Sequence, residues 1–153
     1  MAREIEDKYL VTNTSWREIV DESSRITQTY LLAKRQLTIR TRLEDGRPAI
    51  LCIKLAEQST GTPEYEWQIP KWLARLCSKL SSRTLQKVRH RIAWGDLTIE
   101  VDEFEGKLSG LIVAEVERPS VDHQYDLPTW FGLNVTPDER YKNARLIKTG
   151  LPT

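Results

Sequence analysis

Short runs in which apolar and polar residues alternate dominate the chain, and this period of two is typical of β-strands with one buried face. The pattern predicts eight strands, at about residues 3–11, 25–33, 37–44, 49–56, 64–69, 84–93, 97–105 and 111–118. Turn residues such as Asp45-Gly46 and Gly95-Asp96 separate several of them. Because the connections are short, neighbouring strands are expected to pair as antiparallel hairpins.

Two segments predict helices. Pro70 suits a first helical turn, and apolar residues at helical spacing follow it. A second helix is predicted from Thr136 to about Leu146, because Thr136 can cap it and Glu139 stands where a capping box needs a carboxylate. The segment 119–135 contains two prolines and a glycine, and it gives no clear prediction.

Length and composition indicate a single domain over residues 1–153. The 23 basic and 22 acidic residues nearly cancel, whereas a general nucleic-acid binder usually carries a basic surplus, so no nucleic-acid partner is expected. The charged N-terminus does not resemble a signal peptide, and no apolar run approaches the roughly 20 residues of a membrane helix. A cytoplasmic protein is therefore expected, with no membrane partner and with Cys52 and Cys77 as reduced thiols.

Charged residues recur two positions apart within the predicted strands, and they are sorted by sign. Acidic groups are Glu4 and Glu6, Glu64 and Glu66, Glu100 and Asp102, and Glu115 and Glu117; basic groups are Arg40 and Arg42, Lys54, and Lys87, Arg89 and Arg91. Like charges at i and i+2 share a strand face and gain nothing from each other on an ordinary surface. Half-buried strands with solvated outer faces nevertheless remain the alternative interpretation.

These two sets of charge suit a metal–polyphosphate complex. Adjacent carboxylates are costly unless a cation lies between them, and several oxygen ligands suit Mg²⁺ or Mn²⁺. Arginine and lysine suit phosphate. If the sheet closes into a barrel of about eight strands, both sets can face an interior that holds one small ligand. The apolar strand faces would then point outward, under the helices or a partner subunit.

With these residues in view, the chain resembles the CYTH superfamily, also called triphosphate tunnel metalloenzymes. The family's N-terminal E-x-E-x-K signature reads Glu4-Ile5-Glu6-Asp7-Lys8 here. The other charged groups follow in the family's order as far as Arg140-Tyr141-Lys142-Asn143, so the resemblance covers about residues 3–146. It implies an α+β, mainly β fold: a closed tunnel of eight antiparallel strands with a few flanking helices. The chain is most similar to the stand-alone bacterial inorganic triphosphatases.

The resemblance also implies roles for individual residues. Mg²⁺ or Mn²⁺ would be held by Glu4, Glu6, Asp102, Glu115 and Glu117. The substrate would be bound by Lys8, Arg40, Arg42, Lys54, Glu64, Lys87, Arg89 and Lys142. Glu4, Glu6 and Lys8 would be catalytic. The expected reaction is an in-line attack of water on a triphosphate, giving orthophosphate and pyrophosphate.

Two other functions remain open. An adenylyl cyclase of the same fold would use the same tunnel, but it would also need an adenine pocket, and no residues for one are apparent. A polyphosphate or nucleotide sensor without turnover would not need so many carboxylates. His90 shares a strand face with apolar residues and is predicted to pack. The sequence leaves open the choice of metal and whether the protein is a monomer or a homodimer.

Overall fold

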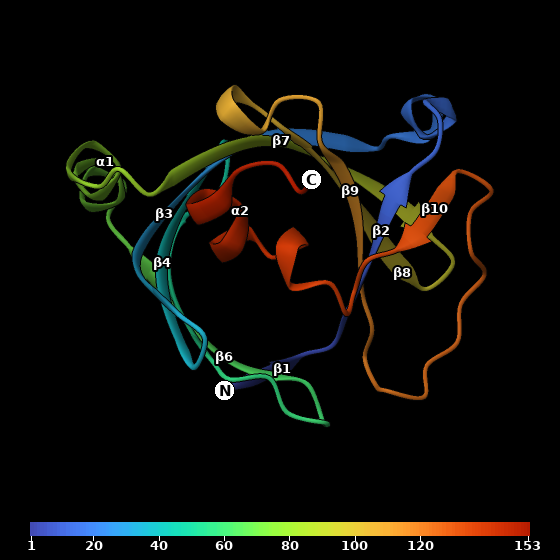
Figure 1. Cartoon of the computed structure of the whole chain (residues 1–153), viewed down its shortest axis with the longest axis horizontal. Helices are drawn as coiled ribbons and strands as arrows, with labels where there is room; N and C mark the ends of the chain where they lie inside the picture. Colours follow the sequence, from blue (N-terminus) through green and yellow to red (C-terminus); the bar gives the residue numbers. More distant parts are fainter.

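The structure is a computed structural model that describes residues 1–153, and its main feature is a strongly curved antiparallel sheet (Figure 1). Its strands are β1 (Ala2–Glu4), β2 (Glu6–Val11), β3 (Glu22–Lys34), β4 (Leu37–Glu44), β5 (Ala49–Leu55), β6 (Thr62–Ile69), β7 (Thr84–Trp94), β8 (Leu97–Phe104), β9 (Ile112–Glu117) and β10 (Phe131–Asn134). The helices are α1 (Lys71–Leu80), α2 (Asn143–Thr149) and the short 3₁₀ segments η1 (Ser15–Ile19), η2 (Gly106–Leu108) and η3 (Glu139–Tyr141).

The sheet contains ten strands in the order β1-β6-β5-β4-β3-β7-β8-β9-β2-β10. The prediction of a closed eight-stranded barrel is therefore wrong in strand number and in closure. The reason lies at the N-terminus, where one predicted strand, 3–11, divides at Ile5. β1 pairs with β6, β2 pairs with β9, and the carbonyl of Ile5 accepts a hydrogen bond from the Arg118 backbone N–H at 2.7 Å. The two sides of the sheet are thus joined by the backbone at Ile5 and not by continuous hydrogen bonding between strands.

Gly61 permits the close approach of β1 to the turn before β6. A Cβ on this residue would lie 2.9 Å from the Glu4 carbonyl oxygen and 2.9 Å from the Ile5 side chain, and its φ is +106°. Only glycine accepts both conditions at little cost. The tenth strand, β10, lies in the segment 119–135, whose pattern predicts no element, and it pairs Phe131 with Val11 of β2.

The helix predicted after Pro70 is confirmed as α1, which packs on β3, β4 and β5. The predicted helix from Thr136 to Leu146 is wrong in its bounds: Lys142, with φ −71° and ψ 132°, separates η3 from α2. Asp138 makes the side-chain cap by accepting a hydrogen bond from the Arg140 backbone N–H. Thr136 instead accepts a hydrogen bond from the Lys8 backbone N–H at 2.9 Å, which ties this segment to β2.

Two hydrophobic clusters hold the sheet in shape. The first lies on one face of β7, β8 and β9 and consists of Trp16, Ile92, Ile99, Val101, Ala114, Val116 and Trp130. The second contains Tyr30, Ala33, Leu85, Phe104, Leu108, Val113 and Leu146, and Leu146 belongs to α2. Because α2 lies inside the curve of the sheet, the interior is apolar where this helix packs (Figure 1). The expectation that apolar faces point only outward is wrong for this part.

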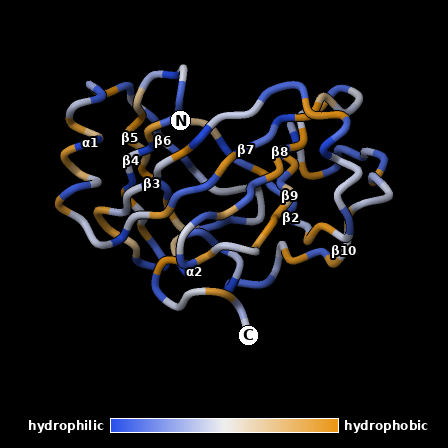
Figure 2. Tube along the Cα trace, turned by 90° about the horizontal axis from the view of Figure 1, so that it is seen from above, coloured by the Kyte–Doolittle hydropathy of each residue, from blue (hydrophilic) through white to orange (hydrophobic).

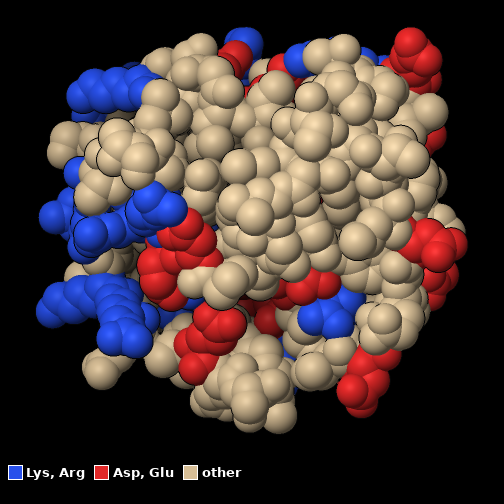
Figure 3. All heavy atoms as spheres, turned by 45° about the vertical axis from the view of Figure 1, so that its right-hand side comes forward, with Lys and Arg blue, Asp and Glu red and all other residues tan.

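Hydrophobic and hydrophilic positions alternate along the strands, as Figure 2 shows. On the face of the molecule in Figure 3, a broad uncharged area occupies the centre, and acidic and basic side chains lie around it. Cys52 is buried, Cys77 on α1 is half-buried, and both are free thiols. Neither α1 nor α2 combines the length and the apolar character that crossing a membrane requires.

Candidate active site

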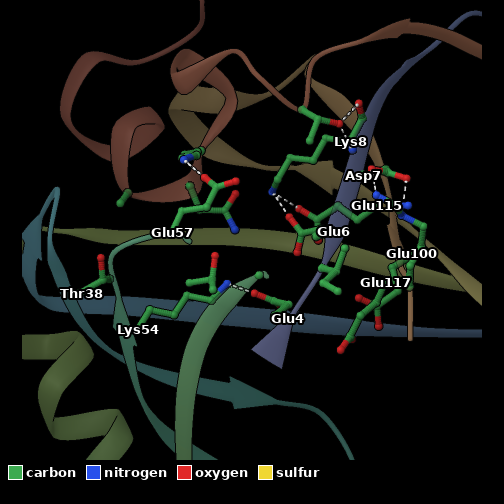
Figure 4. Close-up of a pocket in the computed structure, with 18 of the residues that line it drawn as sticks. Glu4, Glu6, Asp7, Lys8, Thr38, Lys54, Glu57, Glu100, Glu115 and Glu117 are labelled. Atoms are coloured by element: carbon green, nitrogen blue, oxygen red, sulfur yellow. Dashed lines mark hydrogen bonds and ion pairs between the residues drawn. The ribbon is translucent and has the colours of Figure 1, made fainter. Parts of the chain in front are cut away.

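A cavity with a volume of about 740 Å³ has a strongly charged lining (Figure 4). Strands from both sides of the sheet and the segment around Lys142 contribute to it. The predicted site residues that line it are Glu4, Glu6, Lys8, Arg40, Arg42, Lys54, Arg89, Glu115, Glu117 and Lys142. The structure thus brings together residues that lie more than a hundred positions apart in the sequence.

An acidic wall, formed by Glu4, Glu6, Glu115 and Glu117, occupies one side of the cavity (Figure 4). The pairing of β2 with β9 places Glu6 opposite Glu117 and Lys8 opposite Glu115. The Lys8 Nζ lies 2.7 Å from Glu6 Oε1 and 2.6 Å from Glu115 Oε1. Burial acts to lower the pKa of Lys8, but these two carboxylates outweigh it and raise that pKa. One ammonium group therefore neutralises part of the wall.

The remaining negative charge of the wall is visible in its pKa values. Burial raises the pKa of Glu6, and the charge of Glu115 adds to the effect. Burial also raises the pKa of Glu117, as do the charges of Glu4 and Glu100. Glu117 makes no ion pair and no side-chain hydrogen bond. The wall therefore has carboxylate oxygens in excess of its cations, and a hard divalent ion such as Mg²⁺ or Mn²⁺ fits this donor set.

Glu115 has the opposite shift. Burial works to raise its pKa, but Lys8, Lys87 and Arg89 outweigh burial and hold the pKa well below its usual range. Arg89 Nη2 donates a hydrogen bond to Glu115 Oε2 at 2.8 Å. Glu115 is consequently ionised more firmly than Glu6 and Glu117, and it links the wall to the basic residues of β7.

A group of basic residues comes from β4 and β5. Lys54 forms an ion pair with Glu4 and lies 3.3 Å from Glu64 Oε2. Arg40 Nη2 is 4.0 Å from Glu64 Oε1, and its buried Nε has no hydrogen-bond partner. Arg42 Nη2 is 3.6 Å from Glu66. These loose pairs leave guanidinium N–H groups available for a phosphate oxygen.

Three predicted residues do not line the cavity. Asp102 and Lys87 have no exposed surface, and they form an ion pair with each other. Asp102 also accepts hydrogen bonds from Arg89 Nε and Nη2, both at 2.7 Å. Because its oxygens are taken by two cations, this geometry does not support Asp102 as a metal ligand or Lys87 as a phosphate contact. Asp102 instead holds Arg89 in place, and Lys87 neutralises Asp102. Glu64 is 8% exposed and pairs with Lys54 at 3.3 Å.

The structure adds two residues that the predicted site lacked. Glu100 lines the cavity and pairs with Arg89 and, at 3.2 Å, with Arg91. The sequence feature that could have identified Glu100 as a site residue is its acidic doublet with Asp102. Glu57 lies in the β5–β6 connection, where no periodic pattern singles out a residue. Its carboxylate accepts a hydrogen bond from Lys142 at 3.0 Å, which joins that connection to the C-terminal segment across the cavity (Figure 4).

Comparisons with known sequences find a matching family and two related proteins. The sequence profile of the CYTH domain matches residues 2–144. An inorganic triphosphatase of Acetivibrio thermocellus is 31% identical over 97% of this chain and 95% of its own length. An inorganic triphosphatase of Nitrosomonas europaea is 34% identical over 94% and 95%.

Solved structures are similar in fold. A crystal structure of an inorganic triphosphatase aligns with a TM-score of 0.68 at 31% identity, over 100% of this chain and 99% of the other. A putative adenylyl cyclase from Hippeastrum, described as having a dominant triphosphatase activity, aligns with a TM-score of 0.60 over 76% and 80%. Its identity of 17% supports the fold alone. The match over nearly the whole sequence, together with the charged cavity, means that the chain belongs to the CYTH domain family.

Proposed function

We propose that the protein hydrolyses inorganic triphosphate to orthophosphate and pyrophosphate in its charged cavity, with Mg²⁺ or Mn²⁺ as cofactor. The observation that carries this proposal is the presence of an acidic wall and several loosely paired basic residues around one cavity. Two relatives of almost the same length, both inorganic triphosphatases, support the substrate. A triphosphate and its metal need these two kinds of side chain together.

The acidic wall is the proposed metal site. Glu4, Glu6 and Glu117 supply carboxylate oxygens at the cavity surface, and the charge on Glu117 has no cation partner in the protein. Glu115 completes the set, although Lys8 and Arg89 already engage it. A bound divalent ion would supply positive charge to the phosphate oxygens and make a coordinated water more acidic.

The basic residues are proposed to orient the substrate. Arg40 and Arg42 line the cavity, and their guanidinium groups are only loosely paired, at 4.0 Å from Glu64 and 3.6 Å from Glu66. Lys54 and Arg89 would neutralise charge on the remaining oxygens, which favours attack of water in line with the leaving pyrophosphate. Lys8, fixed between two carboxylates, would position the end of the triphosphate nearest the metal. Lys142 would keep the C-terminal segment over the cavity through Glu57.

Identification of products from three substrates tests the proposal. Purified protein is incubated with inorganic triphosphate, ATP and thiamine triphosphate, each with Mg²⁺ or Mn²⁺. Orthophosphate and pyrophosphate from inorganic triphosphate, at a higher rate than from the other two, are expected. Formation of cyclic AMP from ATP would instead identify a cyclase. Binding of triphosphate without metal-dependent turnover would identify a binding module.

A further inference from the structure

All but one of the basic side chains that line the charged cavity have an acidic partner. The paired side chains, each with a nitrogen within 4.0 Å of a carboxylate oxygen, are Lys8, Arg40, Arg42, Lys54, Arg89, Arg118 and Lys142. The exception is Arg35, which lines the cavity but makes no ion pair and no side-chain hydrogen bond. Its guanidinium is therefore the cation that the protein itself leaves free to meet an anion.

Arg35 lies in the turn between β3 and β4, at one end of the cavity. Leu37 and Leu55 form the terminal pair of β4 and β5, so this turn and the connection that follows β5 emerge at the same end of the two strands. Glu57 belongs to that connection and also lines the cavity. Figure 4 shows Glu57 across the cavity from Glu117 of the acidic wall. The end that carries Arg35 is thus remote from the proposed metal site.

The other basic residue at this end, Lys142, is already neutralised. Its Nζ lies 3.0 Å from Glu57 Oε2 and 2.7 Å from Glu139 Oε1. Because two carboxylates surround one ammonium group, Lys142 attracts an incoming phosphate only weakly. Arg35 has no such competitor, and a guanidinium presents its N–H donors as a fork that matches two phosphate oxygens.

We propose that Arg35 is a further substrate-binding residue, which captures the triphosphate anion at the rim of the cavity. This inference rests on the proposed function. Arg35 donates hydrogen bonds to the phosphate oxygens that lie farthest from the acidic wall, and it touches no atom that reacts. A free cation at the mouth of a charged cleft raises the rate at which an anion enters. The residue therefore contributes to binding and not to the chemical step.

Steady-state kinetics at several salt concentrations test the role of Arg35. Arg35→Gln should lower kcat/KM for triphosphate about tenfold at low ionic strength, the lower end of the range for electrostatic steering. The loss should lie in KM, with kcat unchanged, because binding alone is affected. At about 1 M salt, where the Debye length is about 3 Å, the loss should shrink to about twofold or less. Arg35→Lys keeps the charge and should restore most of the wild-type KM.

Arg75→Gln is the matched control, because Arg75 is exposed on α1, outside the curve of the sheet, and makes no ion pair (Figure 1). It removes the same charge from the protein and should match the wild type at every salt concentration. Equal losses in the two variants would mean that only net charge matters. An unchanged KM in Arg35→Gln would mean that this side chain does not meet the substrate. Either result would overturn the proposal.

Calorimetric titration with triphosphate in Mg²⁺ separates this proposal from the proposed function. Suppose that the wild type binds triphosphate without hydrolysing it, and that Arg35→Gln binds about tenfold more weakly than Arg75→Gln at low ionic strength. The assignment of Arg35 then stands and the proposed function fails. If the wild type hydrolyses triphosphate and Arg35→Gln does so with the same kcat and KM, the function stands and the role of Arg35 is refuted. A wild type that neither binds nor hydrolyses triphosphate refutes both.

Discussion

The carboxylates of the acidic wall differ in their electrostatic surroundings. Substitution of Glu6 tests whether the wall binds a metal ion. Replacing Glu6 with glutamine keeps the shape but removes the charge that a divalent ion needs. We expect turnover of triphosphate in Glu6→Gln to fall at least about 100-fold, more than the usual cost of losing a second-shell partner. Phosphate release in saturating Mg²⁺ and in Mn²⁺, with circular dichroism to check the fold, measures this.

Glu18→Gln is the matched control, because Glu18 is exposed on η1 and makes no side-chain contact. This variant should keep wild-type turnover. Full activity of Glu6→Gln in both metals would show that the metal has been assigned to the wrong acids.

Lys87 and Asp102 form a buried ion pair, which predicts a large effect on stability. Lys87→Met removes one of the two cations that neutralise Asp102 in an interior without water, and leaves Arg89 as its remaining partner. Breaking such a pair typically costs about 3–5 kcal/mol in the free energy of unfolding. Arg25→Met, which breaks the exposed pair of Arg25 with Glu105, should cost about 1 kcal/mol or less.

Denaturant unfolding of both variants measures the difference. Equal losses in the two variants would mean that Arg89 alone satisfies Asp102.

Glu44 gives stability a specific dependence on pH. Burial opposes its charge, but hydrogen bonds from Ser24 and Arg91, with Arg47 nearby, outweigh burial and lower its pKa from 4.5. The folded state therefore binds this proton less readily than the unfolded state. The resulting stabilisation is present above about pH 4.5 and is lost as the pH falls through the lowered pKa.

Glu44→Gln should accordingly be less stable than the wild type by about 1.5–3 kcal/mol at neutral pH, the value of a charged hydrogen bond. The difference in the free energy of unfolding should shrink on acidification. A difference that stays constant from neutral pH to well below pH 4.5 would exclude the Glu44 charge as its source.

Much of the site was predictable residue by residue, since alternation along strands identifies which charges share a face. The parity of Glu4, Glu6, Arg40 and Arg42 placed them correctly towards a common interior. The exceptions are Glu64, Lys87 and Asp102, which do not line the cavity. For Asp102, the pairing with Arg89 depends on the register of β7 against β8. A single sequence does not specify that register. It therefore cannot distinguish a carboxylate that faces the cavity from a buried one that lysine and arginine side chains already neutralise.

At the scale of elements, the turn before β6 controls where β1 lies. Gly61→Ala places a methyl group 2.9 Å from the Glu4 carbonyl oxygen at a φ of +106°, so β1 must move. We expect a loss of about 1–3 kcal/mol in stability, together with lower turnover, because Glu4 moves with β1. Gly46→Ala is the control: its φ is also positive, at +74°, but a Cβ there meets nothing within 4 Å.

Gly46→Ala should therefore show the backbone strain without the effect on turnover. If the two alanine variants have the same activity, contact between Gly61 and β1 does not position Glu4. Unfolding curves and phosphate release on the same preparations make the comparison direct.

Elements with a strong period were predictable, and elements decided by tertiary contacts were not. The strands from β3 to β9 lie close to the predicted ranges, since their alternation is long and regular. The division of β1 from β2 depends on where β6 and β9 lie, which local pattern does not encode. The same holds for β10, which forms only because β2 offers it an edge, and for the extended Lys142 that ends η3.

At the scale of the whole molecule, apolar packing and the charged cavity divide the sheet between them. One hydrophobic cluster lies on β7, β8 and β9, and the other fills the interior beside α2. The charged residues occupy the remainder of the interior. Stability and chemistry therefore use different parts of the same strands, so substitutions in the cavity need not unfold the protein.

The division of the N-terminal segment between β6 and β9 bears on how the molecule is made. A ribosome delivers Glu4 and Glu6 first, but β6 follows about sixty residues later and β9 more than a hundred residues later. Contacts so distant in sequence form slowly and late. A nascent chain released before residue 115 would carry the first half of the acidic wall without the second. The proposed metal site is thus among the last features that the growing polypeptide completes.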